Sequence, residues 1–237
     1  MLSKTPPFPS VKSVCLNLDD EPLRALLEAL LREWGYRLSA DPVDQPLLII
    51  GEGLAIPSGF RHILTLCRSH YQDRKRLEIP LMIESLYLAL ENHFHRTPRN
   101  HIRIPLEWPI RVWVRGDEFE TRTLTVADRG MRFISPLELA REEELKVRLE
   151  RADETYHLTA RAVYSLVGRE IGREDRIEVG AVCTPQSKEV RESIRSWIIA
   201  TYLERVRPAL EPQLFAEALQ HLNLTQLTGE IVRGERG

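Results

Sequence analysis

The pattern of apolar and polar positions divides the chain into a first part with buried-strand and helix signals, a middle part of alternating strands, and a helical end. Residues 11–18, 46–53 and 61–67 are short apolar runs bounded by Pro, Gly or charged residues, which is typical of buried strands. Leucines recur at helical spacing between the first two runs. Strand, helix, strand and strand predict a small parallel α/β layer.

The helix of the first part has clear boundary signals. Asp19, Asp20 and Pro22 stand at its start, where acidic side chains and proline suit the first turn. Gly35 follows its end and suits a left-handed cap. A second helical pattern in residues 79–94 closes this part of the chain.

From residue 104 the apolar period changes to two, which predicts strands. Residues 110–114 alternate, Gly116-Asp117 forms a turn, and residues 119–126 return as the second half of a hairpin. Further strands are predicted at residues 131–135, 144–150, 155–167 and 176–184. Five or six short antiparallel strands within about 80 residues indicate a small β-barrel.

The last part of the chain is predicted to be helical. Residues 187–206 start with Ser187 as a cap, carry an apolar stripe through Ile194, Trp197 and Tyr202, and stop before Pro208. A shorter helix follows in residues 212–224. The stripe either covers the barrel or the first domain, or it forms an oligomer interface. We therefore expect three regions, residues 1–94, 95–185 and 186–237.

Composition and charge limit the function. The 237 residues are 43% hydrophobic and 29% charged with a net charge of −2, as in soluble globular proteins with about two domains. Such a chain is not built to coat a nucleic-acid polymer, so any anion site must be local. The N-terminus lacks the apolar core of a signal peptide and no run is long enough for a membrane helix, so we expect a cytoplasmic protein. Three separated cysteines inside apolar runs predict buried free thiols.

The chemistry-bearing motifs point to binding rather than catalysis. The chain has no nucleophile elbow, P-loop or Gly-rich dinucleotide turn, so we predict that it is not an enzyme and needs no cofactor. His93, His95 and His101 lack acidic or cysteine partners at ligand spacing, which favours packed or solvated histidines over a metal site. Basic residues are dense between Arg96 and Arg132.

The opening LNLDDEPLRALLEALLREWGY and the step Ile79-Pro80 resemble segments of response-regulator receiver domains, over residues 10–94. The resemblance implies a flavodoxin-like fold. Gly51 stands where the family has its phosphate-accepting aspartate, Ile79 where it has a lysine, and Cys67 where it has Thr or Ser. We therefore expect a degenerate receiver-like domain that serves dimerisation or partner docking.

The acidic pair of this domain has two interpretations. In the receiver family such a pair holds Mg²⁺, and the resemblance leaves that role open for Asp19 and Asp20. Their place in the first turn favours helix capping instead. A further alternative is that Glu52 acts as a fixed mimic of a phosphorylated acceptor.

The segment RNHIR has an RxxxR element at Arg99 and Arg103, and ARAVYSL and EVGAVC read as late barrel strands. Residues 96–185 resemble the PilZ family, whose members are bacterial receptors for the second messenger cyclic di-GMP. The family's second element is Asp or Asn, then Ser two residues on, then Gly three further. It falls on Thr125, Ala127 and Gly130, so only the glycine is kept.

The resemblance implies an α+β multidomain protein with a six-stranded antiparallel PilZ barrel that binds cyclic di-GMP as a ligand. Arg99 and Arg103 would clamp phosphate and guanine, because guanidinium groups bind phosphate bidentately and stack on bases. Thr125 offers a hydroxyl, Ala127 offers no polar group, and Gly130 permits close backbone approach.

Three functions remain as hypotheses. The first is a signalling protein that binds cyclic di-GMP where connector and barrel meet, and changes the placement of its domains. The second is a ligand-independent adaptor that binds another signalling protein or itself. The third, a DNA-bound regulator, is opposed by the charge balance. Trp108 and Trp113 either offer stacking surfaces or pack in a core or interface.

Overall fold

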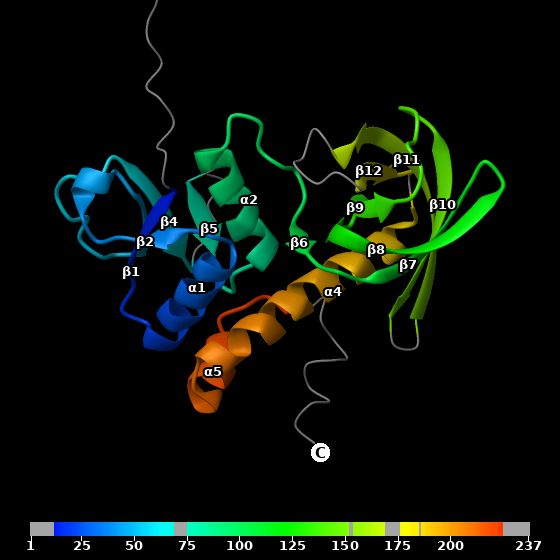
Figure 1. The fold of residues 1–237 in the computed structure, drawn as a ribbon. Helices are drawn as coiled ribbons and strands as arrows, with labels where there is room; N and C mark the ends of the chain where they lie inside the picture. The colour runs from blue at the N-terminus through cyan, green and yellow to red at the C-terminus, as the bar shows by residue number, and fades with distance from the viewer. Residues whose placement is uncertain (1–11, 69–74, 152–153, 169–175, 185, 225–237) are drawn as a thin grey trace, which may run out of the picture. The chain divides into compact units, whose positions relative to one another are not determined.

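A computed structural model describes residues 12–68, 75–151, 154–168, 176–184 and 186–224 (Figure 1). The chain forms two compact units, one built from the chain up to Asn100 and again from Ile199 onward, the other from residues 101–198. The division falls inside helix α4 (Lys188–Val206). Each unit has its own sheet.

The first unit contains a five-stranded parallel sheet in the order β2-β1-β3-β4-β5. Its strands are β1 (Ser13–Asn17), β2 (Arg37–Leu38), β3 (Leu47–Gly51), β4 (His62–Cys67) and β5 (Arg76–Glu78). The predicted parallel α/β layer is thus confirmed. Strands β2 and β5 were not predicted, because they are short and polar and exist only through pairing with β1 and β4.

Helices α1 (Glu21–Glu33), α2 (Ile83–Phe94) and α5 (Pro212–Leu219) belong to the first unit, as do the 3₁₀ turns η1 (Pro42–Asp44) and η2 (Arg207–Ala209). The predicted start of α1 is confirmed, since Asp20 Oδ1 accepts a hydrogen bond from the Leu23 amide at 2.9 Å. Gly35 beyond its end has φ +78°, a left-handed conformation that suits glycine. Helix α1 packs against α5.

The core of the first unit is aliphatic. Leucines of α1 and α2 and the central strand β3 supply side chains with almost no exposed surface: Leu26, Leu27, Leu30, Leu48, Ile49, Leu86 and Leu90. Strand β3 lies between β1 and β4 and is buried over four consecutive residues, as expected for a central parallel strand.

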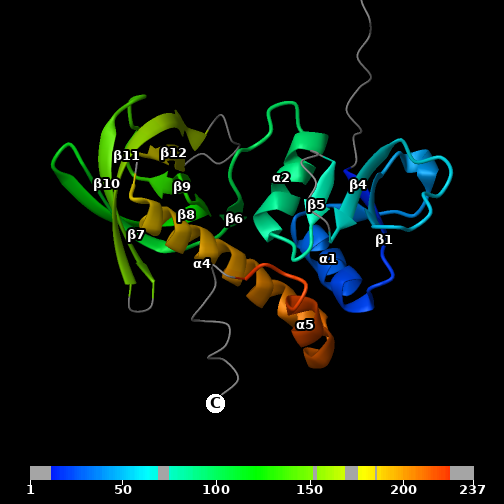
Figure 2. The ribbon, with the colours of Figure 1, turned by 180° about the vertical axis from the view of Figure 1, so that it is seen from behind.

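The second unit is a β-barrel. Six strands close in the order β8-β7-β10-β11-β12-β9, with β9 paired back to β8, and β6 adds to the other edge of β8 (Figure 2). The strands are β6 (Arg103–Pro105), β7 (Pro109–Val114), β8 (Asp117–Ala127), β9 (Gly130–Ser135), β10 (Glu144–Arg151), β11 (Glu154–Leu166) and β12 (Ile177–Cys183). The predicted six-stranded antiparallel barrel is confirmed, and β6 is an addition to it.

The first hairpin shows why the sequence pattern works here. Ile110, Val112 and Val114 on β7 are buried and face the barrel interior, while the residues between them point outward. The two-residue loop is Arg115-Gly116, with φ +54° and +90°, and not the predicted Gly116-Asp117, because Asp117 already pairs with Val114. Positive φ at both loop residues matches the twist of the strands.

The predicted helix after the barrel is α4, and Ser187 Oγ accepts a hydrogen bond from the Val190 amide at 3.3 Å. In the barrel unit, Ile194, Trp197 and Ile198 are buried. Trp197 meets Trp108 edge to face, with ring centroids 5.0 Å apart. In the first unit, Tyr202 is buried beside Trp34 at 5.9 Å. The apolar stripe therefore packs inside the two units.

Candidate functional site

Strand register brings three of the five predicted site residues, Arg103, Ala127 and Gly130, into one row across the barrel. Arg103 on β6 lies opposite Ala127 on β8, and Ala127 lies opposite Gly130 on β9. The row continues to Val182 on β12 and Arg161 on β11. Residues directly opposite in antiparallel strands have side chains on the same face of the sheet. The RxxxR arginine Arg103 and the second motif element are therefore neighbours.

This row lies on the outer face of the barrel. The alternate residues Val126, Met131 and Ala181 are buried in the interior, whereas Val182 and Arg161 are about half exposed. Small residues occupy the middle of the row and larger ones its ends. A ligand placed there would contact the small residues Ala127 and Gly130.

Gly130 is required by its neighbour strand. A Cβ atom at this position would lie 2.5 Å from the carbonyl oxygen of Ala181 and 3.3 Å from Cα of Val182. Both atoms belong to the backbone of β12, which cannot move without breaking its pairing with β9. The motif glycine thus has a packing role in addition to any role toward a ligand.

The turn between β8 and β9 holds a buried carboxylate. Asp128 is 1% exposed, and its Oδ2 accepts a hydrogen bond from the Arg195 guanidinium of α4 at 2.7 Å. His101 Nδ1 lies 3.3 Å from Asp128 Oδ1. The turn is also fixed to β12, because the Cys183 amide donates to the carbonyl of Arg129 at 2.9 Å.

Positive charge exceeds negative charge around this turn. The pKa of His101 lies below its ordinary value, chiefly because burial disfavours the charged ring, although the Asp128 carboxylate opposes that shift. The positive charges that add to it belong to Arg129, Arg195 and Arg103. Three arginines and one carboxylate thus lie close enough to the His101 ring to act on its charge, and this excess of positive charge favours an anionic ligand beside the turn.

Asp128 also affects the thiol of Cys183. Burial, and then the nearby carboxylate, raise the pKa of Cys183 to about 12, so this thiol stays protonated at neutral pH. Cys15, Cys67 and Cys183 are all free, as predicted. The prediction that these thiols are buried is confirmed for Cys67 only, because Cys15 and Cys183 are partly exposed.

Arg99 belongs to the first unit, whereas Arg103 belongs to the barrel unit. The Arg99 guanidinium donates to the Tyr87 hydroxyl at 3.1 Å and to Glu91 Oε1 at 3.3 Å. The Arg99 amide also donates to Glu91 Oε2 at 3.3 Å. Glu91 is 3% exposed, so this carboxylate is a buried partner that the sequence pattern did not reveal.

Two arginines near the motif were not predicted as site residues. Arg129 lies in the turn beside Gly130, is exposed, and its guanidinium has no partner among the described residues. Arg132 lies opposite Thr125 and is 3.6 Å from Glu178. Arg132 follows Gly130 by two residues in the sequence, but its position opposite Thr125 depends on the strand register.

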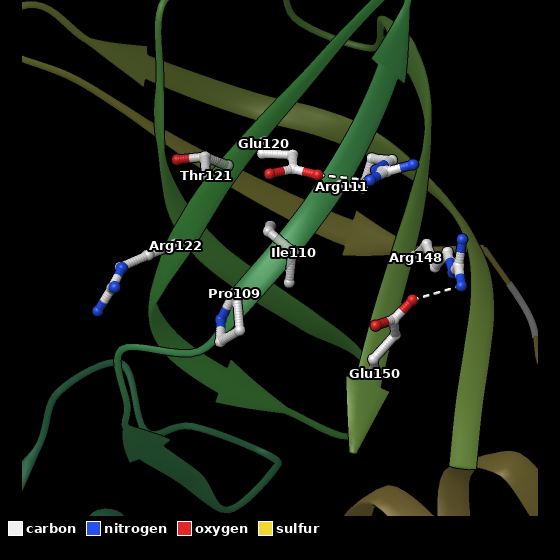
Figure 3. Close-up of a pocket in the computed structure, with 8 residues that line it drawn as sticks. All are labelled: Pro109, Ile110, Arg111, Glu120, Thr121, Arg122, Arg148 and Glu150. Atoms are coloured by element: carbon white, nitrogen blue, oxygen red, sulfur yellow. Dashed lines mark hydrogen bonds and ion pairs between the residues drawn. The ribbon is translucent and has the colours of Figure 1, made fainter. Parts of the chain in front are cut away.

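A separate pocket of about 340 Å³ lies over β7, β8 and β10 (Figure 3). Two of its three arginines already have carboxylate partners, Arg111 with Glu120 and Arg148 with Glu150. Arg122 is the third and is exposed. The two carboxylates offset two of the three positive charges in the lining, so the pocket is less suited to an anion than the β8–β9 turn.

The first unit has a pocket of about 330 Å³ at the carboxyl ends of β1, β3 and β4. Asp20 caps α1 and its Oδ2 lies 3.0 Å from His221 Nε2, while Glu52 Oε2 accepts from the Arg68 amide at 3.0 Å. Asp19 is exposed at the same edge. Asp20 and Glu52 thus already have partners within the chain.

Within the described ranges, no group of three or more His, Cys, Asp or Glu side chains is placed to hold a metal ion. No helix in the same part of the chain has the length and apolarity that a membrane crossing requires.

Residues 97–200 match the family model described as PilZ domain. The predicted PilZ domain is thereby confirmed for this segment, which includes the barrel and the first part of α4. No curated protein matches the chain.

Solved structures also match. The inhibitor of motility from Bacillus subtilis is 10% identical with a TM-score of 0.40, over 46% of this chain and 53% of its own. The PilZ domain of YcgR from Escherichia coli with c-di-GMP is 13% identical with a TM-score of 0.39, and the match covers 48% of this chain and 98% of that domain. MrkH from K. pneumonia, in its complex with c-di-GMP, is 14% identical with a TM-score of 0.42, and the match covers 47% of this chain and 56% of MrkH. The matched region thus spans about half of the Bacillus protein.

Proposed function

We propose, on the premise that residues 97–200 form a PilZ domain, that this chain is a cytoplasmic signalling protein that binds cyclic di-GMP and is not an enzyme. The observation that carries the proposal is the row in which Arg103 lies opposite Ala127 and Ala127 opposite Gly130. The excess of positive charge at the adjacent turn supports an anionic ligand.

The proposed chemistry begins with Arg103. Its guanidinium offers several donors in one plane, which suits a phosphodiester oxygen or the edge and face of a guanine. Thr125, opposite Pro105, supplies a hydroxyl that has no hydrogen-bond partner among the described residues. Ala127 supplies none, and Arg129 compensates with an exposed guanidinium beside Gly130.

Arg99 would join the ligand only after leaving Glu91 and Tyr87. The ligand must therefore compete with a buried carboxylate for this arginine. Such competition would let ligand binding change contacts inside the N-terminal unit. We propose this as the way in which ligand binding at the barrel affects the N-terminal unit through the segment from Arg99 to Arg103. It also makes Arg99 a weaker contributor to affinity than Arg103.

Calorimetry of the full chain with cyclic di-GMP tests the proposal. We expect binding that Arg103→Ala abolishes, whereas Arg122→Ala, which removes an exposed arginine of β8 at the separate pocket, leaves it unchanged. Arg99→Ala should weaken binding, and Glu91→Gln should strengthen it by releasing Arg99. Absence of heat up to about 100 µM ligand, which corresponds to about 5.5 kcal/mol, would refute the receptor function.

A second function, a ligand-independent adaptor, is favoured by the contacts of Arg99 with Glu91 and Tyr87 and by Ala127 in place of serine. In that case the PilZ domain and the N-terminal unit offer only protein-docking surfaces. The same titration separates the two functions, because an adaptor shows no heat with cyclic di-GMP and retains its fold in Arg103→Ala.

We infer that the N-terminal unit is a degenerate receiver-like domain. Its strand order β2-β1-β3-β4-β5 is that of flavodoxin-like sheets. Gly51 at the end of β3 provides no phosphate acceptor, and Asp20 is engaged as a helix cap and by His221. Incubation with a phosphoryl donor and Mg²⁺ should leave no acid-labile phosphate, and its appearance would contradict this inference.

A further inference from the structure

A second row of residues runs beside the motif row on the outer face of the barrel. It contains one residue from each of β6, β8, β9, β12 and β11: Pro105, Thr125, Arg132, Gly180 and Tyr164. Thr125 is the only member that the PilZ motif covers. Two large side chains, Arg132 and Tyr164, thus face the same surface on either side of a glycine.

Gly180 makes room for the ring of Tyr164. A Cβ atom at Gly180 would lie 2.3 Å from Cζ and 2.4 Å from Cε1 of Tyr164, so the ring covers the glycine. Tyr164 is nevertheless 40% exposed, and Val182 near it is 51% exposed. The ring is therefore held against the sheet and still presents surface to the solvent. An aromatic surface of this kind is suited to stacking with a planar base.

Arg132 has a counter-ion that a ligand can replace. Its Nη1 lies 3.6 Å from Glu178 Oε2, beyond ordinary hydrogen-bond length, and Glu178 is shared with Arg176 at 3.7 Å. Arg132 is 40% exposed. A phosphate oxygen forms a shorter, charge-assisted bond with a guanidinium than this carboxylate does. Glu178 would keep its interaction with Arg176 when Arg132 turns to a ligand.

We propose that Tyr164 stacks on a purine base of the ligand and that Arg132 binds one of its phosphates. This proposal rests on the proposed cyclic di-GMP function and adds residues to the same site. The polar contact missing at Ala127 on β8 is then supplied by Arg132 on β9, and Tyr164 on β11 adds a stacking surface. The ligand class is a purine nucleotide that has both an accessible base face and a phosphate.

A purely structural role for Tyr164, shielding the backbone at Gly180, predicts different results. Loss of the ring would then change stability and leave ligand affinity unaltered. Affinity measured on folded variants therefore separates the two roles. Arg176 is a matched control for Arg132, because both arginines pair with Glu178 but only Arg132 lies in the row with Thr125.

The experiment is calorimetric titration of the full chain with cyclic di-GMP, with GMP as a second probe. Tyr164→Ala should weaken cyclic di-GMP binding about 10- to 100-fold, as expected for the loss of one stacking contact. Tyr164→Phe should bind like the wild type, since it keeps the ring. Gly180→Ala should weaken binding because it displaces the ring without removing it. Arg132→Ala should weaken binding at least about tenfold, and Arg176→Ala should not.

Thermal unfolding of each variant confirms that it is folded before titration. If Tyr164→Ala and Arg132→Ala bind like the wild type while Arg103→Ala does not bind, this inference is wrong and the proposed function stands. If the wild type itself gives no heat with cyclic di-GMP, both are wrong. Equal affinity for GMP and cyclic di-GMP would support the proposal that the site contacts one base, through Tyr164, and one phosphate, through Arg132.

Discussion

At the scale of single residues, the motif glycine is explained by backbone packing. Gly130 lies on β9, and a Cβ atom there would lie 2.5 Å from the carbonyl oxygen of Ala181. Retention of this glycine in a PilZ-like motif therefore does not by itself indicate a ligand. Thr125 and Ala127, which face the outer surface without such a constraint, are free to differ from the family pattern.

Gly130→Ala should destabilise the barrel by about 1 to 3 kcal/mol, because the added methyl group meets a backbone that must shift. Thermal or urea unfolding of the variant measures the effect. Ala127→Ser, on the opposing strand and facing solvent, is the control and should change stability by less than about 0.5 kcal/mol. A Gly130→Ala variant as stable as the wild type would contradict the packing role.

Asp128 is the buried anion of the site. Asp128→Asn should lower the free energy of unfolding by about 1.5 to 3 kcal/mol, because a charge-assisted bond with Arg195 at 2.7 Å is lost. Urea unfolding at neutral pH gives the difference. Glu144→Gln removes an exposed partner of Arg161 and should leave stability close to that of the wild type. Equal losses in both variants would show that burial of Asp128 is unimportant.

His93 on α2 should make stability depend on pH. Burial, and then the nearby His62, lower the pKa of His93 to about 4, from an ordinary value of 6.5. Between these values the unfolded chain binds more protons than the folded one, so the free energy of unfolding falls as the pH is lowered from 6.5 to 4.

Urea unfolding at several pH values tests this prediction in wild type and His93→Gln. The free energy of unfolding should fall less in the variant than in the wild type as the pH is lowered, because no imidazole is left to titrate at that position. The control is His157→Gln, which alters an exposed histidine of the barrel. If the pH dependence is the same in all three proteins, His93 is not the group responsible.

At the scale of elements, helix α4 is held to the barrel by specific contacts. The Ser193 hydroxyl is hydrogen-bonded to the Tyr156 hydroxyl, and the Arg195 guanidinium donates to the Asp128 carboxylate. The ring of Trp197 packs edge to face on that of Trp108. Arg195 contacts the β8–β9 turn, which is part of the candidate site. The helix and the site are therefore physically connected within the barrel unit.

Trp197→Ala should destabilise the barrel unit by about 3 to 5 kcal/mol, because Trp197 is 3% exposed and its loss leaves a cavity beside Trp108. Guanidinium unfolding followed by circular dichroism measures the change. Lys188→Ala, on an exposed position of the same helix, should have little effect. A loss below about 1 kcal/mol would mean that Trp197 does not anchor the helix to the barrel.

At the scale of the whole molecule, the chain has two compact units, each with its own buried core. We therefore expect two unfolding transitions in differential scanning calorimetry. Cyclic di-GMP at 100 times its dissociation constant should stabilise the barrel unit by about 2.7 kcal/mol and raise that transition. A shift of the other transition alone would contradict the assignment of the ligand site.

Much of the fold could be predicted from local pattern. The alternation of Ile110, Val112 and Val114 predicted a strand, and the leucine spacing after Asp20 predicted α1. Strands β2, β5 and β6 could not be predicted, because two or three polar or mixed residues become a strand only when a neighbour supplies the hydrogen bonds. The PilZ motif predicted Arg103 and Gly130, but not Arg132 or Tyr164.

The sequence by itself determined the order of the longer elements, the barrel, the ends of α1 and α4 and the motif positions, because these follow from side-chain periodicity, glycine and charge along the chain. Tertiary structure alone decided that Glu91 holds Arg99 and that Asp128 is buried against Arg195, 67 residues away. It also decided that Tyr164 lies over Gly180. The reason is physical: burial, strand register and the partner of a charge depend on neighbours that come together only on folding.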